Sequence, residues 1–358
     1  MSSHRTENLV KRQVPTQMKL RHEVSLTRDS QGIFSLALTP DGQELMVGFG
    51  NGAIQAVNPV DGKSLRDIFS GGVTRQATTA LCFHPRDSSH LISVGAEGIV
   101  AVYNTKTGKC LSSITEENNQ LYTVDVSSDG GTYATAGSNR GIRIYDAKTN
   151  QLINILEPAD YVTSGKELKP ADGHTRRIFA VRFHPEERHI FVSGGWDDSI
   201  KIWDKRMAKE ARKVINGPHI CGPAIDIKNS KILTGSWVAR NALQIWDFRK
   251  SNVEKNIPFP ADKDHGEFLY AARYCTSEIV IAGGSGTNSV QAINFKTDAG
   301  PVPSVPAVLE ITMVLSLSQV LGEIKLHQHP VHVVTTVMEG QQIAFAGGGG
   351  ELHIAYLL

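Results

Sequence analysis

The sequence has little of what a disulfide framework, a zinc site or a strongly charged surface would need. It contains only four cysteines, at positions 82, 110, 221 and 275, and no two of them form a CxxC pair. We therefore predict neither a zinc site nor a set of disulfides. Basic residues number 37 and acidic residues 36, so the formal net charge is only +1. Such a chain has no global field that attracts nucleic acid or an anionic membrane, and we expect neither as a partner.

Long uninterrupted hydrophobic runs are also missing. The N-terminal segment MSSHRTENLVKRQ is polar and has no apolar stretch of the kind that a secretory signal needs. The longest apolar stretch, 302–321, is interrupted by prolines, serines and Glu310, so it is not a clean membrane span. Because the cysteines also look like reduced thiols, we expect an intracellular protein, in the cytoplasm.

Helical periodicity is scarce, and a repeat takes its place. The segment 199–204, Ser-Ile-Lys-Ile-Trp-Asp, recurs at 242–247 as Ala-Leu-Gln-Ile-Trp-Asp. Five weaker copies place other residues where these two have tryptophan: Val57, Tyr103, Tyr145, Ile293 and Ala355. Most steps between copies are close to the roughly 40–45 residues of one propeller blade. The two longer steps predict insertions near 157–172 and 299–328.

Each copy has the same internal order of strands and turns. In the fourth copy, the alternating run 178–183 is followed by a turn at 184–187, a second run at 189–193 and a tight turn before the tryptophan-bearing run. Alternation with period two, bounded by turns, is typical of short antiparallel strands. The insertion that contains 305–321 is unusually apolar for a loop, and an extra strand, a short helix and a partner-docking flap all remain open for it.

The fourth copy carries the most specific motif. Gly173-His174 is followed by Ser193, by Trp196-Asp197 and by Trp203-Asp204, which resembles the Gly-His to Trp-Asp repeat of the WD40 family. The resemblance covers about residues 20–358. It implies an all-β fold, a seven-bladed β-propeller of four-stranded antiparallel blades, preceded by a flexible tail at 1–19.

The last copy lacks an outer strand, because the chain ends just after its third one. The segment 20–26 alternates and precedes the first copy. We predict that this segment supplies the missing strand, because closing the ring removes the exposed edges that an open sheet would leave.

Three of the fourth-copy residues have the types of a hydrolase triad: Ser193, His174 and Asp197. The resemblance implies a different role. With Trp203 these residues correspond to a buried, hydrogen-bonded structural tetrad that joins the strands of one blade. We predict no catalytic residue, and the protein is not expected to be an enzyme.

Two further patterns look chemical and are interpreted as structural. The glycine runs at 283–288 and 347–350 lie between two strands, whereas a phosphate-binding loop leads into a helix, so we predict hairpin turns. His327, His329 and His332 have no carboxylate or cysteine beside them to complete a ligand set. No metal and no cofactor are predicted.

The fourth and fifth copies contain all four tryptophans of the chain, two in each. Trp203 and Trp246 fill the core position, which leaves Trp196 and Trp237 in the turns. In the WD40 family the residue before the tetrad aspartate and the residue that opens the first strand resemble the usual top-face contact positions. The second of these corresponds to Arg177 and Phe268. We therefore predict a partner-binding surface formed by Arg177, Trp196, Trp237 and Phe268, because aromatic and arginine side chains dominate interface energetics. The alternative is that the tryptophans only pack on neighbouring loops.

The predicted function is a non-catalytic protein-interaction scaffold, monomeric on its own, that presents a rigid surface to a peptide or protein partner within a larger complex. The alternative is an enzyme or small-molecule binder that uses the axial channel. That alternative needs convergent ionisable groups at the mouth of the channel, and we find no Asp, Glu, His or Arg repeated at one blade position that points there.

Overall fold

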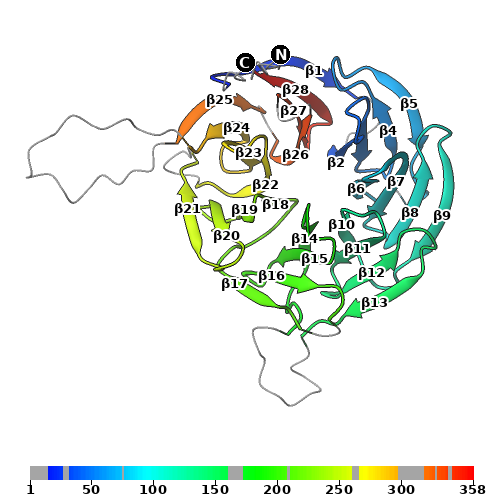
Figure 1. Cartoon of the computed structure of the whole chain (residues 1–358). Helices are drawn as coiled ribbons and strands as arrows, with labels where there is room; N and C mark the ends of the chain where they lie inside the picture. The colour runs from blue at the N-terminus through cyan, green and yellow to red at the C-terminus, as the bar shows by residue number, and fades with distance from the viewer. Residues whose placement is uncertain are drawn as a thin grey trace, which may run out of the picture.

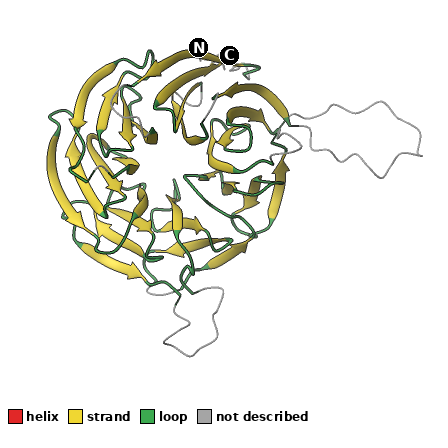
Figure 2. Cartoon of the chain, turned by 180° about the vertical axis from the view of Figure 1, so that it is seen from behind, coloured by secondary structure: helices red, strands yellow, loops and turns green. Residues whose placement is uncertain are grey.

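Each copy of the repeat folds into a four-stranded antiparallel sheet, and seven such sheets stand in a closed ring in the computed structural model (Figure 1). The described residues are 15–26, 32–74, 76–159, 172–207, 210–259, 266–296, 318–326, 329–337 and 341–358. Every element among them is a strand (Figure 2). No helix among them is long and apolar enough to span a membrane.

In blades 1 to 6, consecutive strands are paired in chain order, from the innermost strand at the axis to the outermost at the rim, and in blade 7 the N-terminal strand takes the outermost place (Figure 1). The strands of blades 1 and 2 are β2 (Ile33–Leu38), β3 (Leu45–Phe49), β4 (Ile54–Val57), β5 (Ser64–Phe69), β6 (Thr78–His84), β7 (Asp87–Gly95), β8 (Ile99–Asn104) and β9 (Lys109–Thr115). Those of blades 3 and 4 are β10 (Leu121–Val126), β11 (Thr132–Gly137), β12 (Ile142–Asp146), β13 (Leu152–Leu156), β14 (Ile178–Phe183), β15 (Ile190–Gly195), β16 (Ser199–Asp204) and β17 (Lys213–Asn216).

The remaining blades follow the same plan. The strands of blades 5 and 6 are β18 (Ile225–Lys228), β19 (Lys231–Gly235), β20 (Leu243–Asp247), β21 (Val253–Ile257), β22 (Leu269–Tyr274), β23 (Ile279–Gly284), β24 (Ser289–Asn294) and β25 (Gln319–Lys325). Blade 7 contains β26 (Val331–Val337), β27 (Gln342–Gly347), β28 (Glu351–Leu357) and β1 (Met18–Ser25). Strands β4, β8, β12, β16, β20, β24 and β28 contain the seven repeat positions, so the predicted fold and blade count are confirmed.

The ring is closed by the N-terminal strand, as predicted. β1 pairs antiparallel with β28, with Met18 opposite Leu357 and Ser25 opposite Glu351. The strand begins at Met18, before the alternating segment recognised in the sequence, and Gln17 also exchanges backbone hydrogen bonds with Leu358. Part of the expected tail 1–19 is therefore ordered sheet, and residues 1–14 lie outside the described part.

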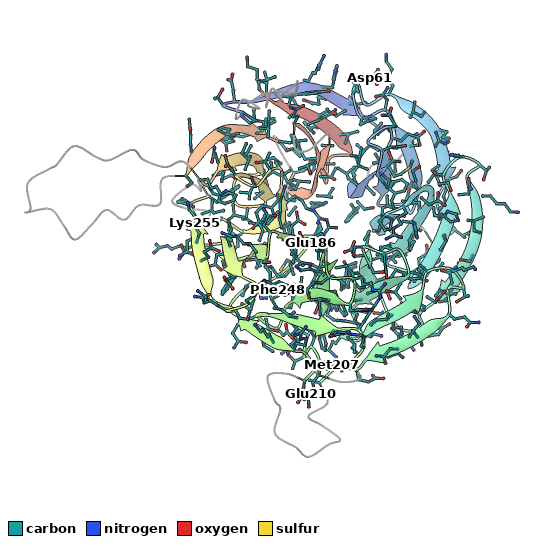
Figure 3. The ribbon with its side chains drawn as sticks, viewed as in Figure 1. Asp61, Glu186, Met207, Glu210, Phe248 and Lys255 are labelled. Atoms are coloured by element: carbon teal, nitrogen blue, oxygen red, sulfur yellow. The ribbon has the colours of Figure 1, made fainter. Side chains whose placement is uncertain are left out.

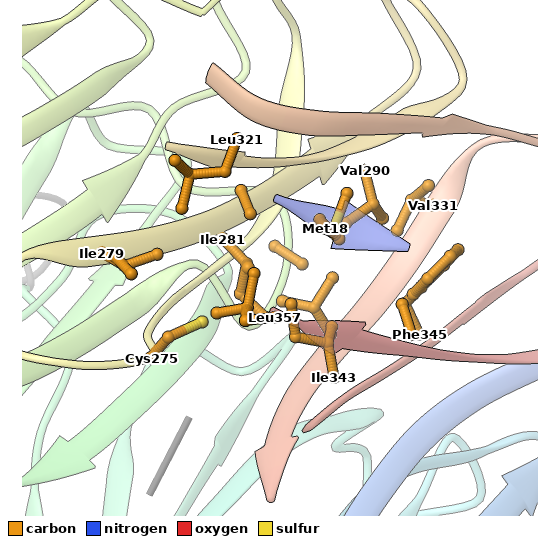
Figure 4. Packing of buried hydrophobic residues seen from close by; sticks show 14 of the residues in the cluster. Met18, Cys275, Ile279, Ile281, Val290, Leu321, Val331, Ile343, Phe345 and Leu357 are labelled. Atoms are coloured by element: carbon orange, nitrogen blue, oxygen red, sulfur yellow. The ribbon is translucent and has the colours of Figure 1, made fainter. Parts of the chain in front are cut away.

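Hydrophobic side chains fill the spaces between blades. Each of the seven core clusters combines residues from two neighbouring blades, and one of them joins blade 7 to blade 1. In the cluster between blades 6 and 7, Met18 of the closing strand packs with Leu321, Phe345 and Leu357 (Figure 4). Every blade therefore packs against a neighbour on both sides, and the ring has no unpaired terminal blade.

The second insertion is shorter than expected. Its C-terminal part is β25, the regular outer strand of blade 6, which pairs with β24 along the strand's whole length. The range 299–328 therefore overstates the insertion, because the alternation of Val320, Gly322 and Ile324 was hidden in a longer apolar stretch. Residues 160–171 and 297–317 lie outside the described part.

Candidate interaction surface

The four residues of the predicted tetrad form one chain of hydrogen bonds inside blade 4. Trp203 Nε1 donates to Ser193 Oγ at 2.7 Å, and Ser193 Oγ lies 2.6 Å from His174 Nε2. His174 Nδ1 donates to Asp197 at 2.8 Å, which fixes the tautomer of the ring. The chain ties strands β15 and β16 to the segment before β14.

Asp197 is the charged end of this network. Burial disfavours its ionised form, but the hydrogen bond from His174 and the backbone N–H of Thr175 favour that form more strongly. As a result, the pKa of Asp197 lies below its usual value. The carboxylate is therefore a fixed acceptor at neutral pH.

Ser193, His174 and Asp197 are hydrogen-bonded in the sequence typical of a hydrolase triad, but a substrate cannot reach the serine. Ser193 is completely buried, and His174 is 1% exposed. The Ser193 hydroxyl is also held by the indole N–H of Trp203. A nucleophile must reach a substrate carbonyl, so this serine is better suited to satisfying buried polar groups than to attack.

Other blades carry partial versions of the network. In blade 5, Trp246 Nε1 donates to Thr234 Oγ1 at 2.9 Å. In blade 3, Glu116 accepts hydrogen bonds from Thr135 at 2.5 Å and from Tyr145 at 3.0 Å. Glu116 was not recognised from the sequence, because a glutamate takes the place of the repeat's histidine. It precedes Thr135 by 19 residues, the same spacing as between His174 and Ser193.

The four residues predicted to face a partner lie in one continuous row. Arg177 Cζ lies 5.4 Å from the ring centre of Trp196, within cation–π range. The rings of Trp237 and Phe268 are 5.0 Å apart. Both turn tryptophans are partly open to solvent, with exposed fractions of 41% for Trp196 and 40% for Trp237. They pack on neighbours and still present an exposed edge.

Three further rings complete this row, and sequence reasoning missed them. His219 stands between the two tryptophans, with ring centres 6.4 Å from Trp196 and 6.5 Å from Trp237. At the other end, Phe179 lies 5.2 Å from Trp196 and stacks on Tyr122 at 4.7 Å. We call the whole row the aromatic belt: Tyr122, Arg177, Phe179, Trp196, His219, Trp237 and Phe268. It crosses blades 3 to 6.

A recurrent β-bulge explains why Tyr122 and Phe179, the belt residues on the innermost strands, point out of the sheet. The pairing of the innermost strand shifts register around its second residue in six of the seven blades, all within the described chain. A bulge frees one residue from the ladder and re-aims its side chain. The freed residues are Phe34, Thr79, Tyr122, Phe179, Tyr270 and His332. His332, one of the three clustered histidines, accordingly packs against the rings of Phe34 and Tyr270.

At the blade 6 end of the belt, Phe268 has an unusual backbone conformation. Phe268 has a φ of 38°, which is rare for a bulky residue and costs on the order of 1–3 kcal/mol. Its N–H donates to Val238 O at 3.0 Å, and the Glu267 carboxylate accepts the N–H groups of Asn241 and Ala242. Glu267 therefore stabilises the turn of blade 5. This turn has no tetrad aspartate and is longer than that of blade 4, because Trp246 follows Trp237 by nine positions whereas Trp203 follows Trp196 by seven.

Cys221 lies beside the belt and is not a reactive thiol. Trp196 Nε1 donates to Cys221 Sγ at 3.0 Å. Burial raises the pKa of this thiol to about 11, against a smaller opposing effect of the indole hydrogen bond. A protonated thiol is a poor nucleophile, so Cys221 orients the indole of Trp196.

The axial channel differs from what the sequence interpretation stated. Figure 3 shows the side chains of the ring, with Glu186 near the axis and Lys255 at the rim. A cavity of about 580 Å³ opens at one mouth of the channel, and its lining includes Asp125, Arg182, Asp226 and Arg273. These four residues occupy equivalent positions near the ends of the innermost strands of blades 3 to 6. Each one is opposite the third residue of the second strand of its blade. The statement that no ionisable residue repeats there was wrong. Aspartate and arginine alternate, so the repeat is visible only once the strands are aligned.

These four charges are paired with one another. Arg182 lies 3.5 Å from Asp125 and 3.2 Å from Asp226, and Arg273 lies 3.6 Å from Asp226. The aspartates also accept the backbone N–H groups of Phe183 and Tyr274. The network therefore links four blades around the axis and has no net charge.

Comparison with known proteins agrees with this geometry. The profile of the family described as WD domain, G-beta repeat matches residues 108–146 and 165–204, which fall in blades 2 to 4. The second match contains the whole hydrogen-bonded tetrad. This chain contains repeats of the WD40 family.

Curated relatives of this WD40 protein are distant. The GATOR2 complex protein WDR24 of Danio rerio is 22% identical over 64% of this chain and 28% of its own length. The target of rapamycin complex subunit LST8 of Mus musculus is 24% identical over 48% of each chain. The ribosome biogenesis protein WDR12 homolog of Culex quinquefasciatus is 26% identical over 34% of this chain and 26% of its own length. The matches thus span half or less of each relative.

Proposed function

We propose that this WD40 protein is a non-catalytic scaffold that binds a peptide or protein partner through the aromatic belt, within a larger complex. The observation that carries the proposal is the continuity of the belt. Exposed indoles, an arginine and a histidine lie in one row on a rigid ring, and side chains of these types typically provide the binding hot spots of interfaces. Relatives named as complex subunits support a protein-interaction role in general terms.

The rigidity of the ring supports the same function. Interfaces lose less affinity to ordering when the contact residues are already held in place. Trp196 is held by Cys221, and Phe268 is held by backbone hydrogen bonds to Val238 and Ser285. The belt is therefore preorganised before a partner arrives. The cytoplasmic location and the monomeric state stay predictions.

Affinity capture with matched variants tests the proposal. We expect the W196A/W237A variant to lose the partners that the wild-type protein retains from cell extract, because each truncated hot spot costs about 2 kcal/mol or more. The control is L111A/L152A, since these leucines are 46% and 47% exposed on outer strands β9 and β13. If the tryptophan variant stays folded and keeps every partner, the belt is not the interaction surface.

The axial channel is the second candidate. The mouth cavity of about 580 Å³ has the size of a small-molecule site. Each of its four charges, however, already has an opposite charge within 3.6 Å, and a catalytic group needs a free position for substrate. The structure favours the scaffold for this reason. Turnover of a metabolite by the purified protein would overturn that choice.

A further inference from the structure

Two carboxylates and one imidazole converge where the two ends of the chain are paired. Glu23 comes from β1, and Glu351 and His353 come from β28. One ligand atom from each of the three lies within 4.8 Å of the other two. Glu23 is directly opposite His353 in the register, and Glu351 is opposite Ser25. The three side chains line a common cavity of about 280 Å³.

His353 is a buried side chain with an unsatisfied ring nitrogen. It is only 3% exposed, and its buried Nδ1 atom has no hydrogen-bond partner among the described residues. Its Nε2 atom lies 3.8 Å from Glu23 Oε2, which is too long for a hydrogen bond. The ring is fixed in this orientation by stacking on Phe345, with centres 5.0 Å apart. A buried polar ring of this kind normally has a ligand or a water to satisfy it.

We propose that Glu23, Glu351 and His353 bind a divalent transition-metal ion, with Zn²⁺ as the reference ion, and that this ion clamps the two strands that close the ring. One imidazole with two carboxylates suits zinc and its neighbours in the first transition row. Calcium and magnesium prefer sites made of oxygen alone. Three protein ligands leave at least one position for water.

The geometry needs only a small adjustment. Ligand atoms about 2.0 Å from a tetrahedral ion lie about 3.3 Å from each other. The present separations of up to 4.8 Å can shorten to this value by rotation of Glu23, whose side chain is 53% exposed, and of the partly exposed Glu351, while His353 stays fixed. Burial lowers the pKa of His353, and the charges of Glu23 and Glu351 oppose this effect.

One cationic group faces the same cavity and opposes the ion. Lys325, at the end of β25, lines the cavity and is exposed to solvent. Its flexible side chain can move away, but its charge weakens cation binding. His329 also lines the cavity and stands beyond the three-ligand cluster. Removing the Lys325 charge should therefore tighten the site.

The sequence could not reveal this site, because its ligands come from opposite ends of the chain. They meet only because β1 completes blade 7. The clustered His327, His329 and His332 drew attention instead, and His332 packs between rings while His327 lies outside the described residues.

Titration of the untagged, chelator-treated full chain with ZnSO₄ in a calorimeter tests the proposal. We expect one high-affinity equivalent in the wild type, affinity lower by roughly tenfold or more in E23Q and in E351Q, and tighter binding in K325M. The matched control is E117Q, which removes an exposed carboxylate elsewhere and should bind as the wild type does. E23Q and E351Q alter partly exposed side chains and should fold normally, so the test does not depend on changing the buried histidine.

A second readout checks the clamp itself. At zinc concentrations about 100-fold above the dissociation constant of the wild type, its melting temperature should rise by about 4 °C, and amide exchange in β1 should slow. A tenfold loss of affinity in E23Q should reduce the thermal shift to about half of this value or less. No binding to the wild type, or the same binding and the same thermal shift in E23Q and E351Q, would overturn the proposal.

Discussion

At the scale of single residues, the tetrad side chains of blade 4 are fixed by hydrogen bonds that the repeat motif predicts. Ser193 is the clearest case, because it joins Trp203 to His174 with no exposure to solvent. Replacing it removes the partner of two buried polar groups at once. By contrast, the hydroxyl of Ser236 is also buried and has no hydrogen-bond partner among the described residues. A comparison of Ser193 with Ser236 therefore separates the effect of hydrogen bonding on stability from the effect of burial.

We expect S193A to lower the free energy of unfolding by about 2–3 kcal/mol, because two buried groups lose their partner. S236A should be neutral or slightly stabilising, since it removes a hydroxyl that makes no hydrogen bond. Urea unfolding of both variants beside the wild type measures the difference. Equal effects of the two substitutions would contradict the account of the tetrad.

Acid sensitivity should reside partly in Asp197. Its folded-state pKa is depressed, so its contribution to stability is complete above the unfolded value near 3.8 and is lost as the pH falls through the lower folded value. The stability difference between the wild type and D197N should therefore be largest at neutral pH and shrink as the pH falls from about 5 to below 3. Parallel urea titrations across this range test it, and a difference that does not depend on pH would be the contrary result.

Among the belt residues, four were predicted and three were not, for a physical reason. Trp196, Trp237, Arg177 and Phe268 stand at repeat positions that the family motif marks. Phe179 and Tyr122 sit inside strands, where only a bulge turns them outward, and a bulge leaves no sequence signal of its own. His219 lies in an irregular segment between blades and reaches the tryptophans only through the fold.

At the scale of elements, the closing strand is the piece on which the ring depends. β1 pairs along β28, and Met18 is buried between blades 6 and 7. The alternation of 20–26 and the missing fourth strand of the last copy made this pairing predictable. The bounds of the second insertion were not predictable, because β25 continues an apolar stretch without a turn residue that marks its start.

Deletion of residues 1–27 should destabilise the protein strongly, since it exposes the edge of β28 and opens one inter-blade core. Deletion of 1–15 should leave the melting temperature unchanged, because Thr16 and Gln17 keep their hydrogen bonds to Leu358. M18A in the full chain should cost about 2–5 kcal/mol through the cavity it leaves. Thermal melts of the three variants provide the measurement, and equal melting temperatures for the two deletions would refute closure by β1.

At the scale of the whole molecule, the blades are joined twice: by hydrophobic clusters between neighbours and by the charge network around the axis. Arg182 of blade 4 connects Asp125 of blade 3 with Asp226 of blade 5. The seven clusters follow from the strand pattern. The network does not, because its alternating charges become a pattern only after the blades are aligned.

We expect R182M to lower the free energy of unfolding by about 1–3 kcal/mol, because two aspartates then face each other with one cation fewer. This is less than the value for a fully buried pair, since the Arg182 side chain is 36% exposed and partly screened by solvent. The control is R206M: Arg206 is 63% exposed and pairs with Asp204, and its loss should change stability by about 0.5 kcal/mol or less. Identical losses in both variants would remove the structural role assigned to the channel charges.

The most direct measurement of the central claim is site-specific photo-crosslinking of the full-length protein to its partner in cell extract. A photoreactive phenylalanine analogue would replace Trp196 or Trp237 in the belt, or Leu111 on the outer rim as a position of similar exposure. Our account predicts the same crosslinked partner from both belt positions and none of it from position 111. Crosslinks that form at position 111 and are missing from both belt positions would contradict it.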